Sequence, residues 1–160
     1  MDSEILDQNL SQQNKLSADE LVLASKGKRF ANLIIDYIIR FVIALILTFG
    51  MEMFGLYQLS YNPIFDILFS LVLVFLYYSL LEASLNGKSI GKFVTQTRAV
   101  NEDGSEIDFN TAMVRSISRL VPFEPFSYLG DSKSGWHDKW SNTVVIDETK
   151  SRQSELNGLE

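Results

Sequence analysis

Two long apolar runs occupy the middle of the chain, one within residues 29–53 and the other within residues 64–85. About 20 helical residues are enough to cross the ~30 Å hydrocarbon layer of a bilayer. The pattern therefore predicts two membrane-spanning helices joined by a short connection. A buried helical hairpin of a soluble protein is the alternative, but the second run is apolar on every face, which favours a lipid environment.

The sequence on either side of these runs is polar. Residues 1–16 predict a disordered N-terminal tail and residues 148–160 a polar C-terminal tail, with one membrane domain over residues 17–147 between them. Ser17 and Glu20 have the spacing of a capping box, which predicts a short helix over residues 18–24.

The sequence after the second run changes texture. Residues 93–100 and 142–147 are rich in β-branched side chains and predict two short strands that pair with each other. Residues 111–120 predict a helix that contains Arg115 and Arg119. Two arginines at the centre of a span cost about 5–7 kcal/mol. We therefore expect an interfacial or re-entrant helix at this position, and no third crossing.

Charge is distributed unevenly along the chain. None of the fourteen Lys and Arg residues lies between positions 41 and 87, whereas five precede this gap and nine follow it. Short translocated loops are poor in Lys and Arg, so both termini are expected in the cytoplasm. The predicted fold class is an α-helical integral membrane protein, made of a two-span transmembrane helical hairpin, an interfacial or re-entrant helix and a small cytoplasmic β element.

Composition narrows the possible chemistry. The net charge is −6 and no basic stripe with interleaved aromatic residues occurs, which argues against nucleic acid as a partner. The chain has one histidine and no cysteine, so we expect no disulfide, no transition-metal site and no cofactor.

A stripe of polar residues lies in the first span. Arg29, Asn32, Asp36 and Arg40 are spaced by three, four and four positions, which places them on one helix face. An unpaired carboxylate in lipid costs several kcal/mol, so the stripe must face protein, a water-filled cavity or headgroups. Two roles stay open. Asp36 binds a cation or proton and is kept ionised by the flanking guanidiniums, or the stripe fastens the first span to the second helix and the cytoplasmic part.

Three further charged residues are candidate partners of this stripe. Glu82, at the inner end of the second span, is expected to pair with Arg29, Arg40 or Arg115, or else to be a solvated helix end. Arg115 and Arg119 share one helix edge, where they bind phosphate headgroups or reach Glu82 or Asp138.

The sequence offers no catalytic constellation. Residues 87–92 (GKSIGK) lack the spacing of a phosphate-binding loop. His137 and Asp138 have no Ser or Cys partner, which favours a structural hydrogen bond. Trp136 and Trp140 beside them are expected to be interfacial anchors. We therefore expect a protein that is not an enzyme.

Several of these features occur together in a known family. They are Arg29, Asp36, Gly87 with Ser89-Ile90-Gly91-Lys92, Asp103-Gly104, Arg115, His137-Asp138 and Thr143-Val144-Val145. In order and spacing they resemble the RDD family of bacterial membrane proteins over about residues 22–147. The family is named after an arginine and two aspartates, which here fall on Arg29, Asp36 and Asp138. The compact region after Arg119 is similar to that of a short subtype.

The resemblance implies a multi-pass protein of the cell inner membrane in which Arg29, Asp36 and Asp138 matter. It also implies transport of a small ion or ligand, with cation/proton exchange associated with one branch. Two spans cannot enclose a pathway, so transport requires a homo-oligomer or another membrane protein in the bilayer. The alternative is a non-enzymatic membrane scaffold or assembly factor that docks partners through its cytoplasmic lobe.

Overall fold

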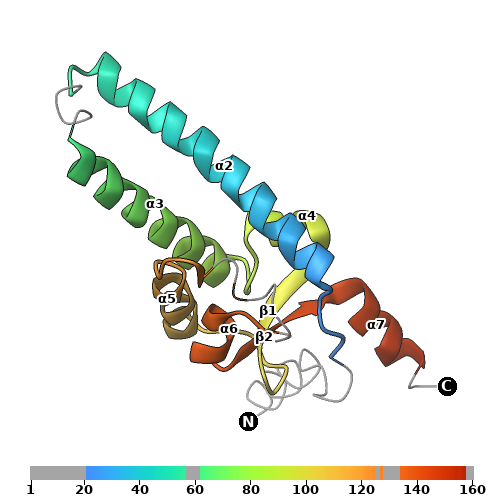
Figure 1. Ribbon diagram of the computed structural model, residues 1–160. Coiled ribbons are helices and arrows are strands. Elements are labelled where there is room, and N and C mark those ends of the chain that lie inside the picture. The colour runs from blue at the N-terminus through green and yellow to red at the C-terminus, as the bar shows by residue number, and fades with distance from the viewer. Residues whose placement is uncertain (1–20, 57–61, 125–126, 128–133, 158–160) are drawn as a thin grey trace, which may run out of the picture.

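The computed structural model describes residues 21–56, 62–124, 127 and 134–157. Two long helices lie side by side and project from a lobe that contains all the other elements (Figure 1). Within the described residues the elements are α2 (Lys26–Met53), α3 (Pro63–Ser84), α4 (Ile90–Thr95), β1 (Thr97–Asn101), α5 (Phe109–Ser118), α6 (Trp136–Trp140), β2 (Thr143–Asp147) and α7 (Glu148–Asn157).

The two long helices start at side-chain caps. The Ser25 hydroxyl accepts a hydrogen bond from the Lys28 amide at 3.2 Å, and the Asn62 side chain accepts one from the Ile64 amide at 3.0 Å. Pro63 is the first residue of α3, where its missing N–H costs least. With 28 and 22 residues, the helices are about 42 and 33 Å long at roughly 1.5 Å per residue. Both predicted spans are therefore present, shifted by at most three residues.

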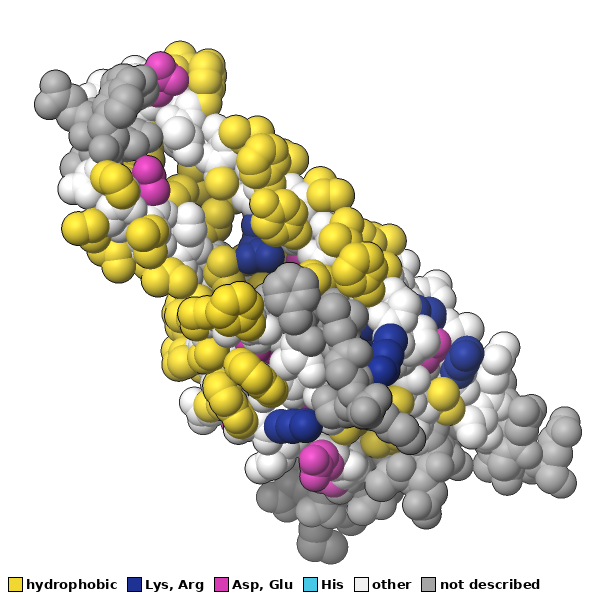
Figure 2. Space-filling model, viewed as in Figure 1, with side chains coloured by type: hydrophobic (Ala, Val, Ile, Leu, Met, Phe, Trp, Pro, Cys, Tyr) yellow, Lys and Arg dark blue, Asp and Glu magenta, His cyan; other side chains and the backbone are white. Residues whose placement is uncertain are grey.

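The outer surface of this hairpin is apolar. Phe41, Ile46 and Phe49 of α2 are more than half exposed, as are Ile64 and Ile67 of α3. Hydrophobic side chains run along both helices in the space-filling view (Figure 2). A soluble protein buries such residues, so the hairpin is not the core of a soluble fold. Both helices meet the length and hydropathy of membrane spans.

The lobe is built on a two-stranded antiparallel sheet. The register runs from Thr97 opposite Asp147 to Asn101 opposite Thr143, as expected for the two predicted strands. Residues 22–24 lie along the other edge of β2, where the Ala24 amide donates to the Val145 carbonyl at 2.9 Å. Helix α4 packs against α2, and α5 packs against α3 (Figure 1). These two contacts join the hairpin to the lobe.

Three local expectations differ from the structure. A helix was expected over residues 18–24, but residues 21–24 are extended, because they pair with β2. Residues 1–20, which include the predicted N-terminal tail, lie outside the described residues. Residues 93–95 of the first predicted strand belong to α4, which Ser89 caps and the left-handed Gln96 (φ 54°) ends. The predicted polar C-terminal tail begins with helix α7. The expected helix over 111–120 is present as α5, which starts two residues earlier because Asp108 caps it.

Candidate functional site

Charged side chains gather where the two long helices enter the lobe. All are buried or nearly so, and they come from α2, α3, α4, α5, α6 and the turn after α5. We call them the buried charge cluster; it consists of Arg29, Asp36, Glu82, Lys92, Arg115, Arg119, Glu124, His137 and Asp138. Such a set is costly to bury unless every charge is paired or hydrogen-bonded.

The Asp36 carboxylate is held by neutral donors. It is 2% exposed, and its Oδ1 accepts hydrogen bonds from the Tyr77 hydroxyl and the Gly91 amide, both at 2.7 Å. Its Oδ2 accepts one from the Ser89 hydroxyl at 2.6 Å. These three donors come from α3 and from the start of α4, so one carboxylate ties α2 to both. The Asp36 carboxylate thus contacts protein groups from two other elements.

The rest of the polar stripe splits between several partners. Asn32 forms hydrogen bonds with the hydroxyls of Thr95 and Thr97. The Arg40 Nε donates to the backbone carbonyl of Asp36 at 3.3 Å, and its guanidinium contacts no carboxylate among the described residues. Arg29 points instead towards α6. The guanidiniums that were expected to flank the Asp36 carboxylate are thus engaged elsewhere.

The α2–α4 contact depends on a glycine. A Cβ on Gly91 would lie 2.5 Å from the Asn32 carbonyl oxygen and 2.9 Å from Oδ1 of Asp36. The absence of a side chain lets the α4 backbone come close enough for its amide to bind Asp36.

Glu82 is the most heavily paired carboxylate. It is fully buried, and its oxygens accept from Lys92 Nζ at 2.7 Å, Arg115 Nε at 2.7 Å and Arg119 Nη2 at 3.0 Å. Of the three arginines that the sequence offered as partners of Glu82, the structure pairs it with Arg115. Burial lowers the pKa of Lys92 to about 8, although the neighbouring Glu82 carboxylate opposes this shift.

Asp138 joins the first span to the lobe. It is fully buried and accepts from Arg29 Nη1 at 2.7 Å, Arg115 Nη1 at 2.9 Å and the Gly135 amide at 3.1 Å. Burial alone would raise the pKa of Asp138, but the adjacent His137, Arg115 and Arg29 hold it well below its usual value. Arg115 bridges Glu82 and Asp138, so the two carboxylates belong to one network.

His137 lies between two carboxylates. Its Nδ1 contacts Glu124 and its Nε2 is 3.2 Å from Asp138. Burial would raise the pKa of Glu124, but its hydrogen bond and charge interaction with His137 lower it. The nearby Ser141 hydroxyl donates to the His137 carbonyl at 2.6 Å, so it does not face the imidazole as a nucleophile would. The contacts of His137 match the structural role expected for it.

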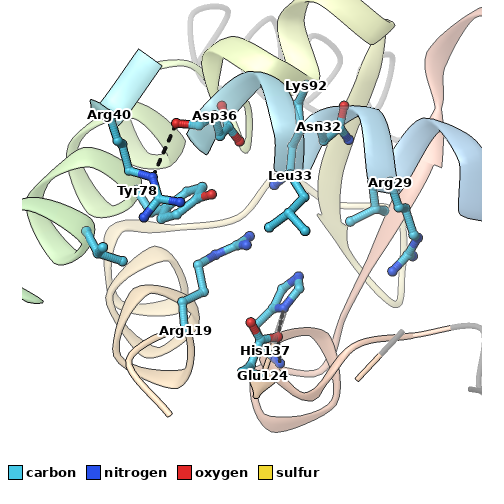
Figure 3. Close-up of a pocket in the computed structure, with 12 residues that line it drawn as sticks. Arg29, Asn32, Leu33, Asp36, Arg40, Tyr78, Lys92, Arg119, Glu124 and His137 are labelled. Atoms are coloured by element: carbon cyan, nitrogen blue, oxygen red, sulfur yellow. Dashed lines mark hydrogen bonds and ion pairs between the residues drawn. The ribbon is translucent and has the colours of Figure 1, made fainter. Parts of the chain in front are cut away.

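A cavity of about 70 Å³ opens beside this cluster. Figure 3 shows Arg40 and Arg119 directed towards it from two sides, with Tyr78 near both and His137 at its floor. The guanidinium carbons of Arg40 and Arg119 lie 5.3 and 4.0 Å from the Tyr78 ring centroid, within the range of cation–π contacts. The lining of the cavity thus combines Arg29, Arg40, Lys92 and Arg119 with two carboxylates, Asp36 and Glu124, and with aliphatic side chains.

Sequence reasoning found most of the charged residues of the cluster but not their neutral partners. The structure places Glu82, Arg115, Arg119, His137 and Asp138, all candidates from the sequence, in the cluster. The residues that were not predicted as site residues are Lys92 and Glu124 of the cluster and Tyr77, Tyr78 and Ser89, which contact it. The signal for two of them lay in the GKSIGK segment, where a helix-capping serine, a small residue and a lysine follow the second span directly.

Comparison with known proteins agrees with this architecture. Neither curated proteins nor solved structures contain a significant match to the chain. The sequence profile of the RDD family matches residues 23–142, three quarters of the chain. The matched range runs from the extended segment before α2 to the residue before β2, and so includes both long helices and the whole buried charge cluster. The chain therefore belongs to the RDD family, a family of membrane proteins.

Proposed function

We propose that this protein is a non-enzymatic membrane scaffold. Its hairpin sits in the bilayer, and the buried charge cluster holds the lobe rigidly at the cytoplasmic surface, where the lobe docks a partner protein or a second copy. The observation that carries this proposal is the Asp36 carboxylate. Its hydrogen bonds from Ser89 and Gly91 tie α2 to the lobe, and its hydrogen bond from Tyr77 ties α2 to α3.

The same geometry argues against cation or proton exchange at Asp36. A carboxylate that loads and releases an ion needs free oxygen lone pairs. Asp36 lines the cavity described above, but both of its oxygens are already engaged by neutral donors. Loading an ion here would require opening the contact between α2 and α4.

Helix α5 supports a position at the membrane surface. It buries Arg115, Ser116 and Ser118 and exposes Phe109 and Ile117. This is the reverse of a helix at the surface of a soluble protein, and it is the pattern of a helix that packs polar groups inward and faces lipid outward. The lobe then lies against the bilayer, on the side where the Lys and Arg residues are found.

Site-specific labelling tests the orientation, since the chain has no native cysteine. Ser154→Cys in α7 should react with a membrane-impermeant maleimide only after the cell membrane is permeabilised. Glu52→Cys, at the far end of α2, should react in intact cells. Labelling of both from the same side would reject the hairpin topology.

Ion flux and crosslinking together test the scaffold role. In proteoliposomes we expect no pH-coupled cation flux above background, and no change with Asp36→Asn. In intact membranes, a photoreactive residue at the exposed Gln153 of α7 should give one discrete protein adduct, whereas one at the lipid-facing Ile46 should give none. Flux that Asp36→Asn abolishes, or the absence of an adduct at Gln153, would favour transport by an oligomer instead.

A further inference from the structure

The cavity beside the buried charge cluster is large enough for a small anion. Its walls are Leu33 and Arg40 from α2, Val74 and Tyr78 from α3, and Arg119 after α5. A cavity needs roughly 10–15 Å³ per water molecule by this measure, so about 70 Å³ holds about five waters. A phosphate group, with four oxygens around one phosphorus, occupies a comparable space.

The charges of the described residues around this cavity do not balance. The buried charge cluster contains four carboxylates and, without counting His137, four Lys and Arg side chains. Arg40 adds a fifth cation at the cavity wall. An unbalanced charge at the depth of a membrane span is costly and is normally neutralised by a counter-ion. The site therefore gains from a bound anion.

Arg40 is where the unmatched charge lies. Asp138 and Glu82 pair with the guanidiniums of Arg29, Arg115 and Arg119. Within the part of the chain that the structure describes, Arg40 contacts the Asp36 carbonyl and the Tyr78 ring and no carboxylate. Among the described residues, Nε and Nη2 of Arg29 and Nε of Arg119 also have no hydrogen-bond partner. Two arginines that line the cavity thus keep buried donors without a partner, and a third, Arg40, has no carboxylate partner among the described residues.

The two carboxylates at the cavity, Asp36 and Glu124, are already included in this count, which still leaves one cation in excess. The oxygens of Asp36 accept three hydrogen bonds from neutral donors, and Glu124 contacts His137, so neither carboxylate pairs with Arg40. Guanidinium forks match the geometry of phosphate oxygens, which is why arginines recur in phosphate sites. The space-filling view shows a gap between the two long helices with a basic side chain at its edge (Figure 2).

We propose that this cavity is a binding site for a phosphate-type oxyanion, with Arg40 as the principal ligand and Arg119 and Arg29 as additional donors. The anion is either free inorganic phosphate or the phosphate of an anionic phospholipid headgroup. The site stands on charge and cavity geometry alone and does not depend on the docking role of the lobe.

Binding to the full-length protein in neutral detergent tests the site. One arm titrates inorganic phosphate, and the other titrates short-chain phosphatidylglycerol with phosphatidylcholine as the zwitterionic comparison, both followed by native mass spectrometry. We expect one saturable equivalent in one of the two arms, and that arm identifies the source. Saturable binding in neither arm would overturn the proposal.

Two variants locate the site. Arg40→Gln should weaken binding at least tenfold, whereas the matched Arg98→Gln should leave it unchanged, because Arg98 pairs with Glu106 and Glu148 away from the cavity. Leu33→Phe should also weaken binding, because it fills the cavity and alters no charge; it decides the matter if Arg40→Gln does not fold. Affinity within twofold of wild type in a folded Arg40→Gln protein would overturn the assignment.

Discussion

Replacing Glu82 by glutamine should be among the most damaging single changes to this fold. The substitution keeps the shape of the side chain but removes the negative charge that Lys92, Arg115 and Arg119 share. Removing one partner of a buried ion pair typically costs about 3–5 kcal/mol, because the remaining charge stays buried without compensation.

The remaining contacts of Arg115 and Arg119 limit the stability lost in Glu82→Gln to that of about one buried ion pair. Arg115 keeps its 2.9 Å contact with Asp138, and Arg119 keeps its place over the Tyr78 ring. Lys92 loses its only carboxylate among the described residues. Because burial already lowers the pKa of Lys92 to about 8, the lysine can release its proton near neutral pH, which prevents a larger penalty. We therefore expect Glu82→Gln to lower the free energy of unfolding by about 3–5 kcal/mol.

Unfolding in mixed micelles of dodecyl maltoside and SDS, followed by the fluorescence of Trp136 and Trp140, measures this change. The matched control is Glu106→Gln, since Glu106 makes an exposed pair with Arg98, and such pairs contribute about 0–1 kcal/mol. Adding Lys92→Met to Glu82→Gln should recover part of the loss, because it removes the cation left behind. If Glu82→Gln costs no more than the control, the pairing scheme is wrong.

Three further results are expected in the same assay. Gly91→Ala should lower the free energy of unfolding by about 1–3 kcal/mol, because its Cβ would clash with the Asn32 carbonyl. The control Gly50→Ala has no atom within 4 Å of its Cβ and should stabilise α2 by roughly 0.5–1 kcal/mol. Equal effects of the two variants would contradict the close α2–α4 contact. Asp36→Asn should cost about 1.5–3 kcal/mol through weakened charged hydrogen bonds, and a neutral result would remove its fastening role. The pKa values of Glu124 and Asp138 are both lowered in the folded protein. Their contribution to the free energy of unfolding should therefore be complete above about pH 5 and lost as the pH falls below about 4. A melting temperature that stays constant from pH 7 to pH 3 would refute this.

Sequence alone determined the features that depend on near neighbours. The two spans follow from the long apolar runs, whose ends were predicted within three residues. The caps at Ser25 and Asn62 were found only in the structure. The polar stripe on α2 follows from helical periodicity, which places residues three and four apart on one face. The pairing of two short strands was also readable, because β-branched segments were rare outside the spans.

Only the tertiary structure decided which charge meets which partner. Arg29 reaches Asp138 across 109 positions of sequence, and Asp36 is held by donors 41, 53 and 55 positions away. Such pairings depend on how the lobe packs against the hairpin, and no local sequence pattern predicts that packing. The same long-range packing made residues 93–95 helical, since Gly91 lets α4 sit against α2 and its helical turn places an amide on Asp36. The β-branched composition of residues 93–95 favoured a strand. The need of the buried Asp36 carboxylate for hydrogen bonds outweighed that preference.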